Sequence, residues 1–477
     1  MKKRFNSIVY LFALLLLMSG CKKWLDVSPK TQVREKILLE TEQGFKDALT
    51  GVYLYLGGSS AYGQNMTMGV LDAMGQRYNV SSTSHIFYRM GRYEYNDPSS
   101  KNYIAGIWGS MYTAIGNLNN ILTQVDAKQS LFTDNNFQLI KGQALALRAH
   151  LQFDLARLFG VAPVVDGNRK SIPYPKSFGI SVYPLLTVNQ ALDSCMKDLS
   201  DAEQLLSVDK TVRKEFATDP FLSFTRNRMN FWAVKGLQAR IWLYRGNKTE
   251  ALAAALEVIN NAAINFPWVT AAEASRTTNR DRLYGNEQLF ALSAYKINDY
   301  VNAYFKTTTT NGTPTLFTSS ANITTLFETA SGGSSDFRFN YLYTLYGSSY
   351  STTKYWQDDI VQGATTEYLR SLVPMIRLSE IYYIAAECAT STTEGVGYLN
   401  TVRTNRGLSA LATTITATAL EAEILKEYKK ETYGEGQLFY YFKRKNTARV
   451  DGSTINMNDA TWAFPLPESE IEFANRF

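Results

Sequence analysis

Histidine and cysteine are scarce in this sequence, which has 477 residues but only two histidines and three cysteines. A histidine-based metal centre or a catalytic triad therefore has few parts available. His150 falls within an apolar helical pattern and is interpreted as a structural imidazole, whereas His85 lies among polar and aromatic residues, where a ligand contact is the second interpretation. Cys195 and Cys388 lie on separate apolar helical patterns, so we expect buried thiols and no disulfide framework. These absences favour a protein without catalytic activity, metal or cofactor.

Long apolar runs and basic clusters are also rare. The formal net charge is +6, but no cluster of Lys and Arg stands out, so we expect no nucleic-acid partner. The one long apolar run, Ile8 to Met18, follows a basic start and precedes Ser19, Gly20 and Cys21. Its length of about eleven residues is too short for the roughly 20 that span a bilayer, and its flanks follow the order of a secretory signal.

The end of this run resembles a bacterial lipoprotein signal, in which a small residue precedes an acylated cysteine. We therefore predict a signal peptide over residues 1–20, lipidation of Cys21 and an extended lipidated tether over residues 21–35. A secreted protein with a coincidental cysteine is the alternative. Residues 36–477 are then expected to form a single helical domain.

Helical periodicity dominates both ends of this domain. Apolar residues over 138–159 cover a wide arc, so this helix must pack on two sides, and Gly160 ends it. We expect it to pair with a helix over residues 188–206. Residues 229–260 read as two helices joined by a tight turn, and a second hairpin is predicted from Pro374, taken as a helix start, to Gly407. The predicted fold class is all-α, a tetratricopeptide-like platform of helical hairpins.

Aromatic residues are abundant, with 30 Tyr, 25 Phe and 7 Trp making 13% of the chain. Many fall in two stretches without sustained helical periodicity, residues 57–104 and 270–369. Loops this long in a compact protein are usually functional or disordered, and the aromatic content argues against disorder. We therefore expect two long, irregular insertions that display rings and form the ligand face.

Several motifs in order along the chain resemble the SusD/RagB-like family of outer-membrane nutrient-binding lipoproteins. They are Cys21-Lys22-Lys23-Trp24-Leu25-Asp26, Trp108-Gly109-Ser110-Met111-Tyr112, Ala146-Leu147-Arg148-Ala149, Leu158-Phe159-Gly160, Ile376-Arg377-Leu378-Ser379-Glu380, Arg406-Gly407-Leu408, Glu435-Gly436-Gln437 and Phe464-Pro465-Leu466-Pro467. The stretch Thr432-Tyr433-Gly434 departs from the family pattern. The resemblance implies a lipid-anchored protein at the outer membrane, exposed on the cell surface, that captures oligosaccharide and delivers it to a SusC-like TonB-dependent transporter.

The expected ligand site combines flat rings, which stack on the C–H face of a sugar, with planar polar groups that bond two hydroxyls at once. The candidate ligand-binding residues are Asp72, Arg77, Tyr78, Tyr88, Tyr93, Tyr95, Tyr295 and Tyr300. Each single ring could instead anchor a loop to the platform. We expect Tyr78→Ala or Tyr295→Ala to weaken ligand binding with little change in melting temperature.

Three other functions remain open: a RagB-like peptide-capturing lipoprotein, a helical scaffold and an unrecognised glycoside hydrolase. The last would use Glu431 and Glu435 as paired carboxylates. Nearby Lys and Arg side chains favour a salt-bridged helix end instead. Arg377, Glu387 and Arg406 are likewise expected to form internal ion pairs, so Glu387→Ala should lower stability.

Overall fold

The computed structural model describes residues 38–307 and 312–473. The predicted signal peptide (1–20), lipidation at Cys21 and tether (21–35) lie outside the described residues. Within the described ranges, no helix combines the length and the apolar character that crossing a membrane requires.

Helices make up most of the described chain. They are α3 (Glu42–Leu56), α4 (Val70–Met74), α5 (Ile86–Gly91), α6 (Pro98–Val125), α7 (Asn136–Phe159), α8 (Pro163–Asp166), α9 (Val188–Leu206), α10 (Phe231–Arg245), α11 (Lys248–Asn260), α12 (Ala262–Asn265), α13 (Ala271–Ala274), α14 (Ile297–Tyr304), α15 (Ser320–Leu326), α16 (Phe337–Tyr341), α17 (Leu378–Cys388), α18 (Thr392–Thr404), α19 (Ala417–Glu431), α20 (Gln437–Arg444), α21 (Asp459–Trp462) and α22 (Glu468–Phe473).

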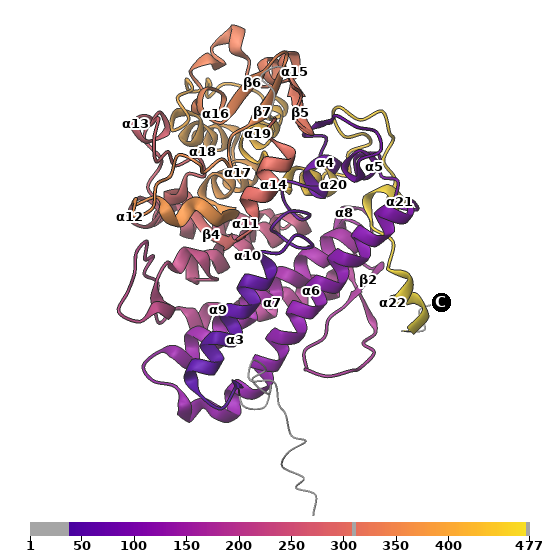
Figure 1. Ribbon diagram of the computed structural model, residues 1–477, viewed down its shortest axis with the longest axis vertical. Coiled ribbons are helices and arrows are strands. Elements are labelled where there is room, and N and C mark those ends of the chain that lie inside the picture. The colour runs from indigo at the N-terminus through magenta and orange to yellow at the C-terminus, as the bar shows by residue number, and fades with distance from the viewer. Residues whose placement is uncertain (1–37, 308–311, 474–477) are drawn as a thin grey trace, which may run out of the picture.

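The predicted helical platform is confirmed. Helix α7 packs between α6 and α9, and α10, α11, α17 and α18 continue as successive antiparallel neighbours (Figure 1). The turn between α10 and α11 uses Gly246 at φ +86°, a left-handed conformation that glycine adopts without a steric penalty. Nearly every residue of α7 is buried, as its wide apolar arc predicted. The all-α, tetratricopeptide-like fold class therefore holds.

The second hairpin begins later than predicted. Pro374 lies in strand β8 (Leu372–Arg377), and α17 starts only at Leu378. Strand β8 pairs antiparallel with β4 (Gln288–Ser293), with Ala291 opposite Pro374. The interpretation of Pro374 as a helix start was wrong because residues 372–377 are buried on both faces and extend along β4. A short run of this kind cannot be told from a buried helix by periodicity alone.

The two aromatic-rich stretches contain more regular structure than expected. The first ends early, because Asp97 caps α6 by accepting hydrogen bonds from the backbone N–H groups of Ser99 and Ser100. Strand β1 (Asn79–Val80) from the first stretch joins β5 (Leu316–Ser319), β7 (Ser349–Thr352) and β6 (Tyr343–Tyr346) from the second in one sheet, in the order β1-β5-β7-β6. A separate pair joins β2 (Lys170–Pro173) and β3 (Leu185–Thr187). The sheet thus holds both stretches on the same side of the platform.

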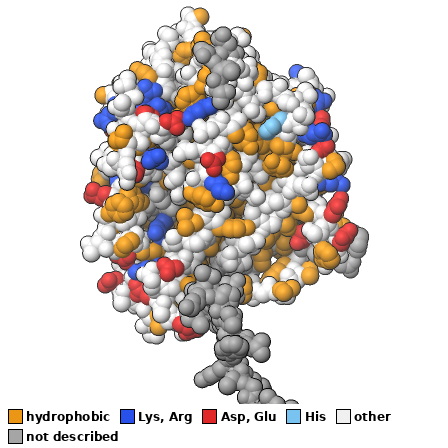
Figure 2. Space-filling view, in the orientation of Figure 1, with side chains coloured by type: hydrophobic (Ala, Val, Ile, Leu, Met, Phe, Trp, Pro, Cys, Tyr) orange, Lys and Arg blue, Asp and Glu red, His pale blue; other side chains and the backbone are white. Residues whose placement is uncertain are grey.

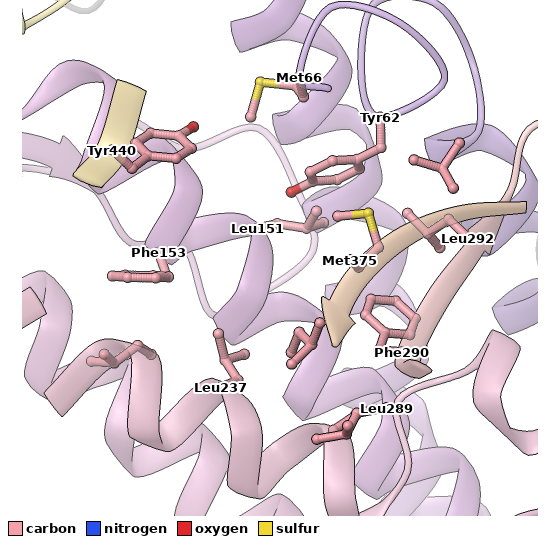
Figure 3. Packing of buried hydrophobic residues seen from close by; sticks show 14 of the residues in the cluster. Tyr62, Met66, Leu151, Phe153, Leu237, Leu289, Phe290, Leu292, Met375 and Tyr440 are labelled. Atoms are coloured by element: carbon pink, nitrogen blue, oxygen red, sulfur yellow. The ribbon is translucent and has the colours of Figure 1, made fainter. Parts of the chain in front are cut away.

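The centre of the core lies where α7 and α10 meet strands β4 and β8 (Figure 3). His150 of α7 is fully buried, with its ring centroid 5.5 Å from that of Tyr62 and 5.8 Å from that of Phe290. Burial lowers the pKa of His150 to about 4, although the charge of Asp154 opposes this shift. The imidazole is therefore neutral near pH 7, and its interpretation as a structural residue is confirmed.

Candidate ligand-binding site

Asp72 is a fully buried carboxylate that holds two distant segments together. Its oxygens accept hydrogen bonds from the backbone N–H of Gly434 at 2.5 Å, from that of Gly436 at 2.7 Å and from the Tyr78 hydroxyl at 2.9 Å. Burial raises its pKa to about 6, although these hydrogen bonds and Arg77 favour the charged form. All its contacts are internal, so we no longer propose Asp72 as a ligand contact.

Arg77 and Tyr78 lie beside it and are also largely buried, each 8% exposed. Arg77 donates to the backbone oxygen of Lys429, and its guanidinium carbon lies 4.6 Å from the centroid of the Tyr433 ring. The Tyr78 ring packs edge-on against Tyr433 at 5.1 Å. Tyr78→Ala is therefore expected to lower the melting temperature, contrary to our expectation from the sequence.

Tyr93 and Tyr95 are loop anchors. Each is 6% exposed, and each hydroxyl donates to a backbone oxygen, that of Met74 at 2.9 Å and that of Thr461 at 2.7 Å. Tyr93 also has φ +59°, a rare conformation for a residue with a large side chain. Their rings point into the fold, so we do not propose them as ligand contacts.

The other three candidate tyrosines reach the surface. Tyr295 is 67% exposed, whereas Tyr88 and Tyr300 are half-buried. Tyr300 belongs to α14, next to Tyr304, and Tyr88 belongs to α5. The structure thus separates the eight predicted residues into internal supports and a smaller set that a ligand can touch.

Four side chains from three segments form what we call the aromatic face: His85, Tyr103, Tyr300 and Tyr304. The Tyr304 ring lies 5.9 Å from the His85 ring, between centroids, and its hydroxyl accepts a hydrogen bond from Gln64 Nε2 at 3.0 Å. Burial, and then the hydroxyls of Tyr103 and Tyr300, raise the pKa of Tyr304. Figure 2 shows a hydrophobic area beside the histidine visible on this side of the molecule.

His85 uses one ring nitrogen to cap a helix. Its Nδ1 accepts a hydrogen bond from the backbone N–H of Phe87 at 3.2 Å, which caps α5 and leaves Nε2 as the N–H donor. Partial burial lowers its pKa, so the neutral form prevails near pH 7. A neutral imidazole among three tyrosine rings provides stacking surfaces and hydrogen-bond donors without net charge.

A groove runs beside this face, past the edge strand β1. It consists of two cavities of about 430 Å³ and about 310 Å³ that share Gln76, Tyr78, Asn79 and Gly452. Tyr88 and Arg92 also line the smaller cavity. The guanidinium carbon of Arg92 lies 5.8 Å from the centroid of the Tyr88 ring. Amide side chains and several aromatic rings, among them Tyr78 and Tyr88, therefore line a channel wide enough for a small ligand.

Sequence reasoning did not single out Gln64 or Tyr103. Tyr103 fell within a stretch interpreted as irregular, but Asp97-Pro98-Ser99 is a helix-start signature that indicates α6. No local signal marks Gln64, because its role depends on the approach of α14 from more than 200 residues away.

The paired-carboxylate interpretation is not supported by the geometry. Glu431 is fully buried and pairs with Arg338, Arg377 and Arg406. Burial by itself would raise the pKa of Glu431, but the three positive charges outweigh this effect and hold the pKa well below its usual range. Glu435 pairs with Arg377 at 2.8 Å and with Lys354. Both carboxylates are ion-paired, as predicted, but their partners come from other elements and not from the nearby Lys and Arg side chains in the sequence. Among the described residues, no three His, Cys, Asp or Glu side chains cluster in a way that could hold a metal ion.

The helical platform, with a face of exposed rings and open grooves built from its insertions, defines a class of helical-repeat protein with a loop-built surface. Two family models match the chain, "Starch-binding associating with outer membrane" over residues 23–243 and "SusD family" over residues 284–472. Together they cover most of its length, and the chain belongs to the SusD/RagB family, as its motifs predicted.

Known relatives agree with this assignment. A SusD superfamily protein from Bacteroides thetaiotaomicron matches with a TM-score of 0.73 and 23% identity over 91% of this chain and 98% of that one. A SusD-like carbohydrate binding protein from Bacteroides vulgatus matches with a TM-score of 0.69 and 20% identity, over 91% and 97%. SusD-like protein P25 from Formosa agariphila is 23% identical over 33% of this chain and 31% of its own length. The chain spans less than half the length of the curated relatives it matches.

Proposed function

We propose that this protein binds glycan at the aromatic face and delivers it to a partner TonB-dependent outer-membrane transporter, without catalysing a reaction on it. The single observation that carries the proposal is the group of partly exposed rings on the aromatic face, where Tyr304 lies against His85 and Tyr300 shares its helix. The exposed Tyr295 lies just before this helix. The description of one matching family model as starch-binding, and of one structural relative as carbohydrate binding, supports the same class of ligand.

The chemistry of the face suits a sugar. Rings offer flat apolar surfaces to the C–H groups of a pyranose, while tyrosine hydroxyls and a neutral imidazole bond its hydroxyls. The adjoining groove adds the amides of Gln76 and Asn79. A peptide-capturing site would instead need apolar pockets and strand edges for backbone pairing. The aromatic face itself is built from α6, α14 and the start of α5 and contains no strand.

The proposal includes the location. We propose that Cys21 is acylated and anchors the protein at the outer membrane, with the aromatic face exposed at the cell surface. The anchor would hold the binding face close to the transporter and raise the local concentration of captured glycan.

The test compares variants in glycan binding, measured by glycan array and calorimetry. Tyr300→Ala and Tyr295→Ala are each expected to weaken the affinity for the bound glycan about fivefold to tenfold, the equivalent of roughly 1 kcal/mol for one stacked ring. Both should leave the melting temperature nearly unchanged, because neither ring is fully buried.

The control is Tyr183→Ala in the connection between β2 and β3, which lies away from α14 in Figure 1. It should bind glycan like the parent. Unchanged binding in both face variants would refute the site, and a parent protein that binds peptides but no glycan would refute the proposed function.

A further inference from the structure

We propose that a second pocket, away from the aromatic face, binds another stretch of the same glycan, and that this glycan is a neutral polymer. We call this second pocket the loop pocket. It is lined by Lys214, Glu215, Phe216, Phe224, Asn227, Glu273, Arg276, Asp281, Asn286, Ser293, Leu372 and residues 363–368 and 371. Its cavity volume is about 810 Å³, within the roughly 300–1,000 Å³ typical of small-molecule sites. The inference rests on the proposed function.

A row of three rings lines this pocket. Phe216 is 84% exposed, and its centroid lies 4.8 Å from that of Phe224 at an interplanar angle of 82°. Phe224 in turn stacks on Tyr368 with centroids 5.8 Å apart and planes inclined by 28°. Phe216 thus adds an apolar ring that is open to solvent to the lining of the pocket. The row therefore offers a platform for a flat apolar surface.

The backbone fixes this row in place. Phe224 has φ +47°, a left-handed conformation that is costly for an aromatic residue. The loop is tied by a hydrogen bond from the Phe224 N–H to the Glu215 oxygen and by one from the Asn227 N–H to the Phe224 oxygen. Residues held in such conformations cluster at ligand-binding sites, where the surrounding structure maintains the strain.

Polar side chains without internal partners surround the rings. Among the described residues, the side chains of Lys214, Glu215, Asn227 and Arg276 form no hydrogen bond or ion pair. Glu, Asn and Arg carry planar groups that can bond two neighbouring hydroxyls at once. Rings flanked by such groups match the chemistry of a sugar chain.

The charge of the lining indicates a neutral ligand. The lining contains four carboxylates and two cations. These are Glu215, Glu273, Asp281 and Glu367, and Lys214 and Arg276. Burial raises the pKa of Asp281 to about 6, but even without its charge the lining carries no positive excess. A polymer of uronic acids or sulfated sugars would meet repulsion here.

The short segment between β4 and α14 links the loop pocket to the aromatic face. Ser293 and Leu372, which line the pocket, are paired where β4 ends and β8 begins. Tyr295 follows two residues later, and α14 with Tyr300 begins at Ile297. The proposal therefore requires a glycan long enough to reach both sites, whereas a disaccharide would occupy only one.

The experiment compares Phe216→Ala, Tyr300→Ala and Phe473→Ala, the last a control ring that is 83% exposed on α22. The probes are a neutral polysaccharide, a disaccharide of the same sugar and a polyuronate, with affinity measured by calorimetry. Phe216→Ala is expected to weaken polysaccharide binding about tenfold and disaccharide binding far less. Tyr300→Ala should weaken both, and Phe473→Ala neither. Arg276→Gln, a change at an exposed side chain, should repeat the effect of Phe216→Ala.

The outcomes separate the two proposals. If Phe216→Ala and Arg276→Gln bind every probe like the parent while Tyr300→Ala is impaired, the loop pocket is not a glycan site and the proposed function stands. If the parent binds no glycan, both proposals fail. If the parent prefers the polyuronate, or Phe216→Ala loses affinity only for peptides in a peptide screen, the ligand class assigned to the loop pocket is wrong.

Discussion

At the scale of single residues, the pair formed by Glu387 and Arg444 makes a measurable prediction. Nη1 and Nη2 of Arg444 each donate a hydrogen bond to one carboxylate oxygen of Glu387 at 2.7 Å. Lys445 Nζ lies 2.9 Å from the same carboxylate. Burial opposes ionisation of Glu387, but these cations outweigh it and lower its pKa to about 2. Glu387→Ala should therefore reduce the free energy of unfolding at pH 7 by about 2–3 kcal/mol, measured by urea unfolding.

The pH dependence follows from the direction of this shift. Because the folded-state pKa of Glu387 is depressed, its contribution is complete above about pH 4.5 and is lost as the pH falls toward 2. The difference between parent and variant should shrink over that range. Glu421→Ala is the control, since Glu421 pairs with Lys445 from an exposed position and should matter little. Equal effects of the two variants would contradict the prediction.

Residue types alone could not separate ligand contacts from supports. Asp72, Tyr93 and Tyr300 all fall in aromatic stretches without helical periodicity, yet the first two are buried and the third is half-buried. A tyrosine suits both roles, because its ring packs inside while its hydroxyl finds a backbone oxygen. The partners that bury Asp72 are Gly434 and Gly436, more than 360 residues away, and no local pattern reveals them.

At the scale of elements, the crossing of α10 with its neighbours depends on a glycine. A β-carbon at Gly236 would lie 2.9 Å from Ile376, 3.1 Å from Leu289 and 3.2 Å from Ile381. Gly236→Leu should overpack this contact and lower the free energy of unfolding by about 1–3 kcal/mol in chemical denaturation. Gly109→Leu on α6 is the matched control, because nothing lies within 4 Å of its β-carbon, and it should be neutral or stabilising. Similar losses in both variants would argue against close packing at Gly236.

Helical hairpins could be predicted well because their apolar spacing is local. Helices α7, α9, α10 and α11 all lie close to their predicted ranges. Strands β4 and β8 were missed because each is only six residues long and buried along its length, and they are separated by almost 80 residues. Short buried strands lack the alternation that marks a half-buried strand, so only their pairing identifies them.

At the scale of the whole molecule, the second insertion and the platform share a buried network of charges. Glu431 at the end of α19 accepts hydrogen bonds from Arg338 of α16, from Arg377 of β8 and from Arg406 after α18. Arg406 extends the network to Glu287, which immediately precedes β4. These ion pairs connect the second aromatic-rich stretch with the helical C-terminal part, so these two parts should unfold in one transition.

Removing the central carboxylate tests this coupling. Glu431→Ala leaves three buried arginines without a shared partner and should cost about 3–5 kcal/mol or more. Because one of these arginines lies in the second insertion, residues 312–369 should become sensitive to limited proteolysis before the platform does, and calorimetry should show a broadened or split transition. Glu421→Ala removes a carboxylate from the same helix at an exposed position and should preserve a single transition. If Glu431→Ala unfolds in one sharp transition with the protease resistance of the parent, the network does not couple the insertion to the platform.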